Sequence, residues 1–271
     1  MIRIGPAGIP LSAKNRTTID GVKCVAELGL QAMEIEFVRG VNMSNEAARE
    51  VGKIAKLLNI ELSIHAPYYI NLNSNDKVKV ASSIKRIKDS LERGAAMGAT
   101  IVVIHAGYYG GMNSEETTNK IIECLEKIPR FDGIKIGLET TGKVRQWGSI
   151  DEILEVCKKM KGCAPVIDFA HIYARQGGRI DFGSVLDRFK GFKHLHCHFS
   201  AINWSPAGEG MGNERNHLPI KEWAPDFRLL AKELVKRKLD ITIINESPLL
   251  ENDALLMKEI IERQGYKWSD K

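Results

Sequence analysis

Histidines and carboxylates recur at the ends of apolar, β-branched runs of the chain. His194, His196 and His198 stand at alternate positions within one such run, so a single face of a strand would carry all three. Imidazoles on the inner face of a strand make poor apolar core but good metal ligands. Other apolar runs end in a residue of ligand type: His65, His105, Glu139, Asp168 with His171 three positions later, and Glu246. The pattern predicts a metal site where several strands converge.

The candidate ligand set is larger than one metal ion requires. Its members are His65, His105, Glu139, Asp168, His171, His198, His217 and Glu246. One zinc ion takes about four ligands, so this set predicts two or three divalent ions, with Glu139 and Glu246 as bridging and catalytic carboxylates. Imidazole and carboxylate without thiolate suit zinc, and also manganese or iron, better than calcium. His196 is a further candidate, either as a ligand or as a side chain that orients one.

Alternating strands and amphipathic helices must position these residues. We expect strands at residues 2–5, 32–37, 61–65, 100–105, 135–139, 164–168, 193–198 and 240–246. We expect helices at residues 17–28, 45–58, 76–97, 114–127, 149–160, 182–189, 226–236 and 252–264. The first of these helices can be capped by Thr17 or Thr18. Between the seventh strand and its helix, residues 200–217 are expected to form a long, flexible, glycine-containing loop.

Eight strand-helix pairs in 271 residues predict a (β/α)8 barrel that forms a single domain over residues 1–271. The rival is a doubly wound open sheet, which places its site at one crevice. Here residues of ligand type end at least six successive strands. Only a closed barrel brings all those ends together.

Composition adds weaker constraints. The net charge of +5 leans towards polyanionic partners, although an excess of Lys and Glu is also typical of thermophiles. The five cysteines lack CxxC spacing and are expected to be small core residues rather than zinc ligands or disulfides. The chain shows neither a membrane span nor a signal peptide. We therefore expect a cytoplasmic protein without a membrane partner, and a monomer.

Five motifs make the whole chain resemble the endonuclease IV family of abasic-site nucleases, within the xylose-isomerase-like superfamily of barrels. They are HAPYYINL at residues 65–72, HAG at 105–107, LETTG at 138–142, DFAH at 168–171 and NESP at 245–248. The resemblance implies a zinc-dependent hydrolase for DNA repair, which cuts the phosphodiester bond 5′ to an abasic lesion in duplex DNA.

The resemblance also implies how the ligands divide among three ions. His65 and His105 would hold one ion with Glu139. A second ion, bridged by Glu139, would lie among three further ligands: Asp168, His198 and Glu246. His171 and His217 would hold the third.

The third site departs from the family pattern. The family has Asp-x-His, whereas Arg215 stands two residues before His217. Glu214, or less favourably Glu209, is expected to supply the missing carboxylate. The alternative is that the third ion is absent or exchangeable and that Arg215 contacts a phosphate.

Three residues are candidates for DNA contacts. The resemblance makes Tyr68 and Tyr69 candidates to stack on DNA or wedge into it, although they could simply pack the barrel mouth. Arg39, just after the second strand, is a candidate phosphate contact, although an exposed arginine is usually only solvated.

Two other function classes remain open at this stage. A sugar isomerase or epimerase of the same superfamily would need one manganese or magnesium ion, and four residues here would hold it: Glu139, Asp168, His198 and Glu246. It would not need the paired histidines His65 with His105 and His171 with His217. The other class is a relative that retains metal and binds nucleic acid without cutting it.

Overall fold

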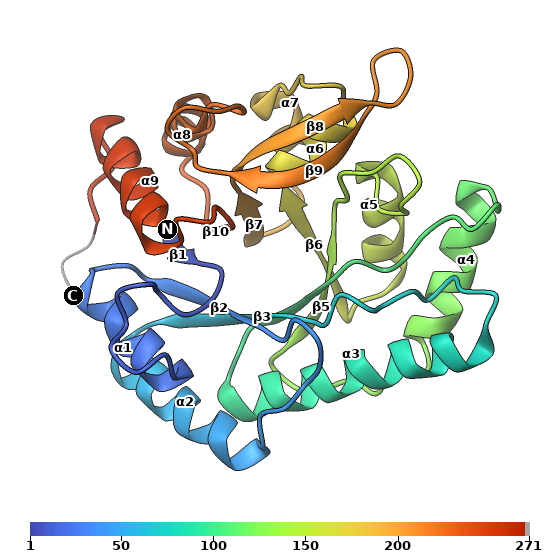
Figure 1. The fold of residues 1–271 in the computed structure, drawn as a ribbon, viewed down its shortest axis with the longest axis horizontal. Helices are drawn as coiled ribbons and strands as arrows, with labels where there is room; N and C mark the ends of the chain where they lie inside the picture. The colour runs from blue at the N-terminus through green and yellow to red at the C-terminus, as the bar shows by residue number, and fades with distance from the viewer. Residues whose placement is uncertain (269–271) are drawn as a thin grey trace.

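Eight parallel strands surround the centre of the structure, a computed structural model that describes residues 1–268 (Figure 1). They are β1 (Ile2–Pro6), β2 (Ala32–Glu36), β3 (Glu61–His65), β4 (Ile101–Ile104), β5 (Lys135–Glu139), β6 (Cys163–Asp168), β7 (Leu195–Phe199) and β10 (Ile241–Asn245). Their order in the sheet is β1-β10-β7-β6-β5-β4-β3-β2. The eight expected strands are confirmed to within a few residues at each end. Residues 269–271 of the expected domain lie outside the described part of the chain.

The two outer strands of this order, β1 and β2, meet and close the barrel. The Gln31 amide donates to Ile4 O at 3.0 Å, and the Gly8 amide donates to Glu34 O at 2.9 Å. The approach is close at Gly5, where an added Cβ would lie 1.6 Å from the carbonyl oxygen of Ala32. A residue without a side chain is therefore required at this seam. The expected TIM barrel is confirmed.

Helices follow the strands and cover the outside of the barrel (Figure 1). Within residues 1–268 they are α1 (Thr18–Glu27), α2 (Asn45–Leu57), α3 (Lys77–Met97), α4 (Ser114–Leu125), α5 (Ile150–Lys159), α6 (Phe169–Arg175), α7 (Phe182–Arg188), α8 (Phe227–Arg237) and α9 (Glu251–Arg263). Local sequence sets their starts. Thr17 accepts from the Asp20 amide, and Asn113 and Ser149 form capping boxes with Glu116 and Glu152.

The expectation of a flexible loop at residues 200–217 is wrong. The segment forms an antiparallel hairpin of β8 (Ala201–Pro206) and β9 (Gly212–Leu218). It packs on α6, a short helix that the sequence reading missed, through Ile202 and Trp204 against Ala170 and Ala174. In Figure 1 the hairpin lies across α6 at the same end of the barrel as the carboxyl ends of β6 and β7. The polar sequence of β9 carries no apolar alternation, so its pairing depends on this contact with α6.

Alternation sorts the residues of each strand to the two sides of the barrel wall. Outward-facing residues such as Ile4, Cys197 and Phe199 belong to the main apolar core between strands and helices. Inward-facing residues stack in layers, as in other barrels of this kind. One half of the middle layer is apolar, with Val103 and Val166 in one small cluster, and the other half is polar. The layer above it, at the carboxyl ends, contains the predicted ligands.

Among the described residues, no helix is both long and apolar enough to cross a membrane.

The seam at Gly5 gives a stability prediction. Gly5→Ala should destabilise the fold by about 1–3 kcal/mol or more, because a buried methyl group would displace β1 from β2. Gly191→Ala is the matched control, since a Cβ there meets nothing within 4 Å. Thermal unfolding followed by circular dichroism compares the two. Equal melting temperatures for wild type and Gly5→Ala would show that the seam has room.

Candidate metal centre

Glu139, at the carboxyl end of β5, lies at the centre of the candidate site. Its Oε2 atom is 2.6 Å from His105 Nε2 and 3.3 Å from His65 Nε2. Its Oε1 atom is 3.1 Å from His198 Nδ1 and 3.4 Å from His171 Nδ1. The barrel thus brings together four predicted ligands from different strand-helix units around one buried carboxylate.

Two groups of ligand atoms share Glu139. Within each group the offered atoms lie within 4.8 Å of one another. One group contains His65, His105 and Glu139, and the other contains Glu139, Asp168, His198 and Glu246. Separations of this size suit donors around a single ion at bond lengths of about 2 Å. A carboxylate that belongs to both groups has the position that a bridging ligand requires.

The β8–β9 hairpin supplies the remaining predicted ligands. Glu214 Oε2 lies 2.9 Å from His171 Nε2. The rings of His171 and His217 have centroids 5.6 Å apart, and His217 Nε2 lies 3.9 Å from Glu246 Oε2. Glu209 is exposed in the turn of the hairpin. Of the two expected replacements for the family's aspartate, Glu214 is the one that the hairpin register directs towards His171.

Arg215 has a different environment from its neighbour Glu214. Its side chain is exposed, and its Nε donates to Ser205 Oγ at 3.0 Å. The register of the hairpin shifts here, with Trp204 opposite Glu214 and Asn203 opposite Asn216, and the exposed Arg215 side chain points away from the ligand cluster towards Ser205.

Backbone and side-chain acceptors fix the orientation of several imidazoles. His65 Nδ1 contacts the carbonyl oxygen of Ala66 at 2.9 Å, and His171 Nδ1 contacts the carbonyl oxygen of Thr140 at 2.9 Å. A carbonyl oxygen only accepts, so each Nδ1 carries the proton and each Nε2 is available as a ligand atom. His217 Nδ1 lies 2.6 Å from Ser200 Oγ, so its Nε2 also faces the cluster.

The pKa values of the residues in this cluster depend strongly on the charges of their neighbours. Burial acts to lower the pKa of His65, but the hydrogen bond to Glu139 outweighs it and raises that pKa to about 10. Burial acts to raise the pKa of Glu139, but His105 and His198 hold it well below its usual range. Burial likewise acts to raise the pKa of Glu214, and His171 holds it well below its usual range. Glu139 and Glu214 are therefore anionic, as metal ligands must be.

Unsatisfied polar atoms test whether this donor set fits divalent ions. At the carboxyl end of the barrel, four buried carboxylate oxygens have no aligned hydrogen bond within residues 1–268: Glu36 Oε1, Asp168 Oδ2, Glu214 Oε2 and Glu246 Oε2. Two of them, Asp168 Oδ2 and Glu214 Oε2, form close ion pairs with His171 at 3.2 and 2.9 Å. Buried polar atoms normally have partners, and a cation can take that place. Cys197, between two of the histidines on β7, faces the outer core, so the donors are imidazole and carboxylate. That set fits zinc or manganese.

The sequence reading missed two carboxylates on β2. Glu34 is fully buried, and its carboxylate contacts His196 and His198. Glu36 lies at the carboxyl end of β2, where burial raises its pKa to about 8. The signal was present in the sequence, because Glu34 and Glu36 alternate with Met33 and Ile35 as inward and outward residues of one strand.

The other two histidines of the β7 region, His194 and His196, lie at different levels along the barrel axis. His196 is buried in the middle layer, and its Nε2 lies 3.1 Å from Glu34 Oε2. His194 precedes β7, since the strand begins at Leu195 rather than at residue 193 as expected. Its Nδ1 lies 3.1 Å from Asp240 Oδ2, at the amino end. His194 is therefore remote from the candidate ligands.

The three candidate DNA contacts are exposed beside this site. Tyr68 and Tyr69 are 64% and 62% exposed, and the ring of Tyr68 lies 5.9 Å from that of His65. The Tyr68 amide donates to the carbonyl oxygen of Val38, next to the exposed Arg39. Large aromatic side chains with this exposure are not packed into the barrel mouth.

A cavity of about 800 Å³ lies at the opposite, amino end of β4–β7. His196 lines it, together with Ile101, Lys135 and Ala164, but the candidate ligands of the carboxyl end do not. In barrels of this fold, activity resides at the carboxyl ends of the strands. The ligand cluster, rather than this cavity, is therefore the candidate active site.

Residues 22–264 match the family described as Xylose isomerase-like TIM barrel. The protein belongs to this family.

Curated relatives include both an uncharacterized protein and probable nucleases. An uncharacterized protein of Methanocaldococcus jannaschii is 36% identical over 95% of this chain and 96% of its own length. A probable endonuclease 4 of Mycoplasmopsis agalactiae is 27% identical over 77% of both chains. A probable endonuclease 4 of Staphylococcus carnosus is 32% identical over 55% of this chain, and the match spans 52% of that relative.

Solved structures of two kinds share the fold. Endonuclease IV from Thermus thermophilus superposes with a TM-score of 0.70 at 20% identity, covering 96% of this chain and 98% of that one. A D-tagatose 3-epimerase-like protein superposes with a TM-score of 0.68 at 21% identity, covering 96% of both. At these identities the likeness establishes the fold alone.

The hairpin gives a prediction about metal content. Glu214→Ala should remove about one zinc ion per chain, because it deletes the carboxylate that faces His171. Arg215→Ala is the matched control and should leave the metal content unchanged. Elemental analysis of both variants after zinc loading provides the measurement. Unchanged zinc in both Glu214→Ala and His217→Ala would remove the third ion from the site.

Proposed function

We propose that this protein is a metal-dependent phosphodiesterase that cuts duplex DNA at abasic sites, in the manner of endonuclease IV. The observation that carries the proposal is the place of Glu139, whose carboxylate belongs to two ligand groups and contacts four histidines. A shared carboxylate is what two neighbouring ions require. The similarity to probable endonucleases 4 supports the same reading.

In the proposed reaction, water attacks the phosphorus atom on the 5′ side of the lesion. A bond forms between the water oxygen and phosphorus, and the bond from phosphorus to the 3′ oxygen of the preceding nucleotide breaks. The products are a 3′-hydroxyl and a 5′-phosphate on the abasic residue. Bound at this cluster, two or three divalent ions would lower the pKa of water to near neutral and would offset charge on the phosphate and the leaving oxygen.

The protein's own residues have separate parts in this proposal. Glu139 would hold two ligand groups together, and Asp168 and Glu246 offer further carboxylate oxygens beside it. No side-chain nucleophile is needed. Tyr68, Tyr69 and Arg39 would contact the DNA around the lesion, since stacking on an aromatic ring is tolerant of sequence and an arginine binds phosphate.

The second candidate is a sugar isomerase or epimerase that uses one divalent ion. It is favoured by the group of Glu139, Asp168, His198 and Glu246, which forms a complete four-residue site by itself. It leaves unexplained why His65, His105 and Glu214 surround the same cluster. A count of zinc or manganese ions per chain separates the two functions, because the nuclease needs at least two and the epimerase one.

Cleavage itself provides the direct test. The zinc-loaded protein should cut a labelled duplex with one tetrahydrofuran abasic analogue and leave a 3′-hydroxyl end. Glu139→Gln should reduce the rate by at least about 100-fold, because an amide cannot provide the anionic bridge, while circular dichroism stays that of the wild type. A wild-type protein that leaves the duplex intact but epimerises ketoses with one bound ion would establish the second candidate.

The exposed tyrosines give a prediction about lesion recognition. Tyr69→Ala should weaken binding to abasic duplex more than to intact duplex, because a wedge gains most where a base is missing. Fluorescence anisotropy with both duplexes at one fixed salt concentration measures the difference, since phosphate contacts make affinity depend on salt. Tyr108→Ala, another exposed tyrosine, is the control. Equal weakening on both duplexes would assign Tyr69 an ordinary surface role.

A further inference from the structure

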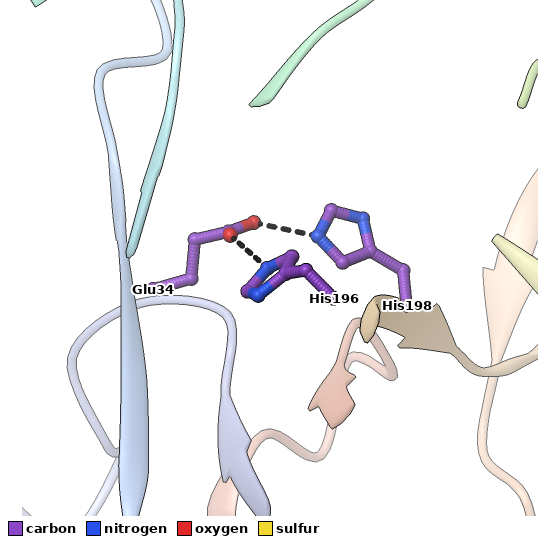
Figure 2. A group of neighbouring side chains, drawn as sticks. All are labelled: Glu34, His196 and His198. Atoms are coloured by element: carbon purple, nitrogen blue, oxygen red, sulfur yellow. Dashed lines mark hydrogen bonds and ion pairs between the residues drawn. The ribbon is translucent and has the colours of Figure 1, made fainter. Parts of the chain in front are cut away.

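Glu34 occupies the middle layer of the barrel, directly beneath the candidate metal centre. It comes from β2 and faces two histidines of β7, as Figure 2 shows. Its exposure is 0%, and that of His198 is also 0%. A carboxylate without contact to solvent must find all its partners within the protein.

The partners of Glu34 divide between its two oxygen atoms. Oε2 accepts from Ser63 Oγ at 2.7 Å and lies 3.1 Å from His196 Nε2. Oε1 lies 3.0 Å from His198 Nε2, in a close ion pair rather than an aligned hydrogen bond. Since β3 and β7 hold Oε2, the other oxygen is fixed towards His198.

His198 faces carboxylates from both edges of its ring. Its Nδ1 lies 3.1 Å from Glu139 Oε1 and 3.2 Å from Glu246 Oε1, in the candidate metal centre. Its Nε2 faces Glu34 below. One neutral imidazole carries one proton, so the edge that keeps the proton decides which edge can bind an ion.

This arrangement is the reverse of that at His65 and His171. In those residues a backbone carbonyl holds the proton on Nδ1 and leaves Nε2 to face the cluster. The backbone of β7 offers His198 no such carbonyl at Nε2, because that atom points across the barrel interior to β2 (Figure 2). A buried carboxylate from another strand occupies the place instead.

We propose that Glu34 is a positioning residue which holds the proton of His198 on Nε2 and so keeps Nδ1 free as a metal ligand. Ser63 and His196 hold the carboxylate in the required pose. The inference rests on the proposed metal centre and goes beyond it, because it concerns the partner of a ligand rather than a ligand. Such partners of metal-bound histidines affect affinity by about 10–100-fold.

The rival reading makes Glu34, His196 and His198 a metal site of their own, since their ligand atoms also lie within 4.8 Å of one another. The contacts favour positioning. Oε2 already has a serine donor in addition to His196, whose Nε2 lies at the 3.1 Å typical of a hydrogen bond. A second ion on Nε2 would also require His198 to lose both ring protons.

Glu34→Gln tests the proposal with little change of shape. If the amide oxygen keeps the contacts with Ser63 and His196, its NH2 group faces His198 Nε2. His198 Nε2 must then accept a hydrogen bond, so the single proton of the neutral ring moves to Nδ1. If the amide flips instead, its NH2 group faces Ser63 and His196, the two residues that contact Oε2 in the wild type. In the flipped pose the amide oxygen could still accept from His198 Nε2, but the contacts of Oε2 with Ser63 and His196 would be lost, so the first pose is the one that those two residues favour.

The measurements are zinc stoichiometry, the chelator concentration that releases half of the zinc, and the visible spectrum of the cobalt-loaded protein. We expect Glu34→Gln to bind the wild-type number of ions at saturating zinc, to release one of them at about 10–100-fold lower chelator, and to change the cobalt spectrum. Glu61→Gln is the matched control. Glu61 is a partly buried glutamate at the amino end of β3 and contacts Arg3, so all three readouts should stay those of the wild type.

The other possible outcomes overturn either the positioning role of Glu34 or the proposed function. Wild-type metal release and spectrum in Glu34→Gln would overturn the positioning role alone. Loss of one whole ion at saturating zinc would make Glu34 a ligand. A wild-type protein that binds neither zinc nor cobalt would overturn the proposed function as well. If Glu34→Gln does not fold, Glu34→Asp gives the same readouts, because it keeps the charge but withdraws it by about 1.5 Å. Metal release unchanged in Glu34→Asp would then overturn the inference.

Discussion

A buried negative charge at Glu139 is the constraint on which the rest of the site depends. An isolated carboxylate in a protein interior is costly, and here four imidazoles surround it within 3.4 Å. Those imidazoles come from β3, the segment after β4, α6 and β7. They can reach one carboxylate only if the sheet closes, and closure requires the close approach of Gly5 to Ala32. The chemistry at one end of the barrel therefore depends on a glycine in its wall.

The barrel interior beneath Glu139 has an apolar half and a polar half. On one side, Val103 and Val166 pack around Gly137, where an added Cβ would lie 2.7 Å from a methyl group of Val166. On the other side, Glu34, Ser63 and His196 form a polar group. Ser63 and His196 both contact Oε2 of Glu34, and these two contacts fix the pose of the carboxylate. That rigidity makes the polar half a suitable support for His198.

The donor arrangement suits both functions proposed above. Glu139, Asp168, His198 and Glu246 can hold one ion, as a sugar epimerase needs. His65 and His105 extend that group to a second ion, and His171 with Glu214 extends it further. Barrels of one fold support unrelated chemistries through such additions at the strand ends. The choice between nuclease and epimerase therefore depends on the added histidines rather than on the fold.

Local sequence signals determined most of the architecture of this protein. The β-branched runs predicted the eight strands of the barrel, and Thr17 marked the start of a helix that the structure has. Local capping boxes at Asn113 and Ser149 begin two more. The same runs placed residues of ligand type at strand ends, because the side-chain period of a strand is readable without any tertiary contact. The resemblance to endonuclease IV added the grouping of those residues, which local pattern could not supply.

Only the tertiary structure decided which residues meet. Pairing of β8 with β9 was hidden from the sequence because it depends on contacts of Ile202 and Trp204 with α6, not on a local pattern. That pairing directs Glu214 to His171 and leaves Arg215 exposed. Glu34 was readable as an inward residue of β2, but its partners are 29 and 162 residues away in the chain for Ser63 and His196. The first contact arises from the pairing of β2 with β3 and the second crosses the barrel interior, and no local propensity encodes either.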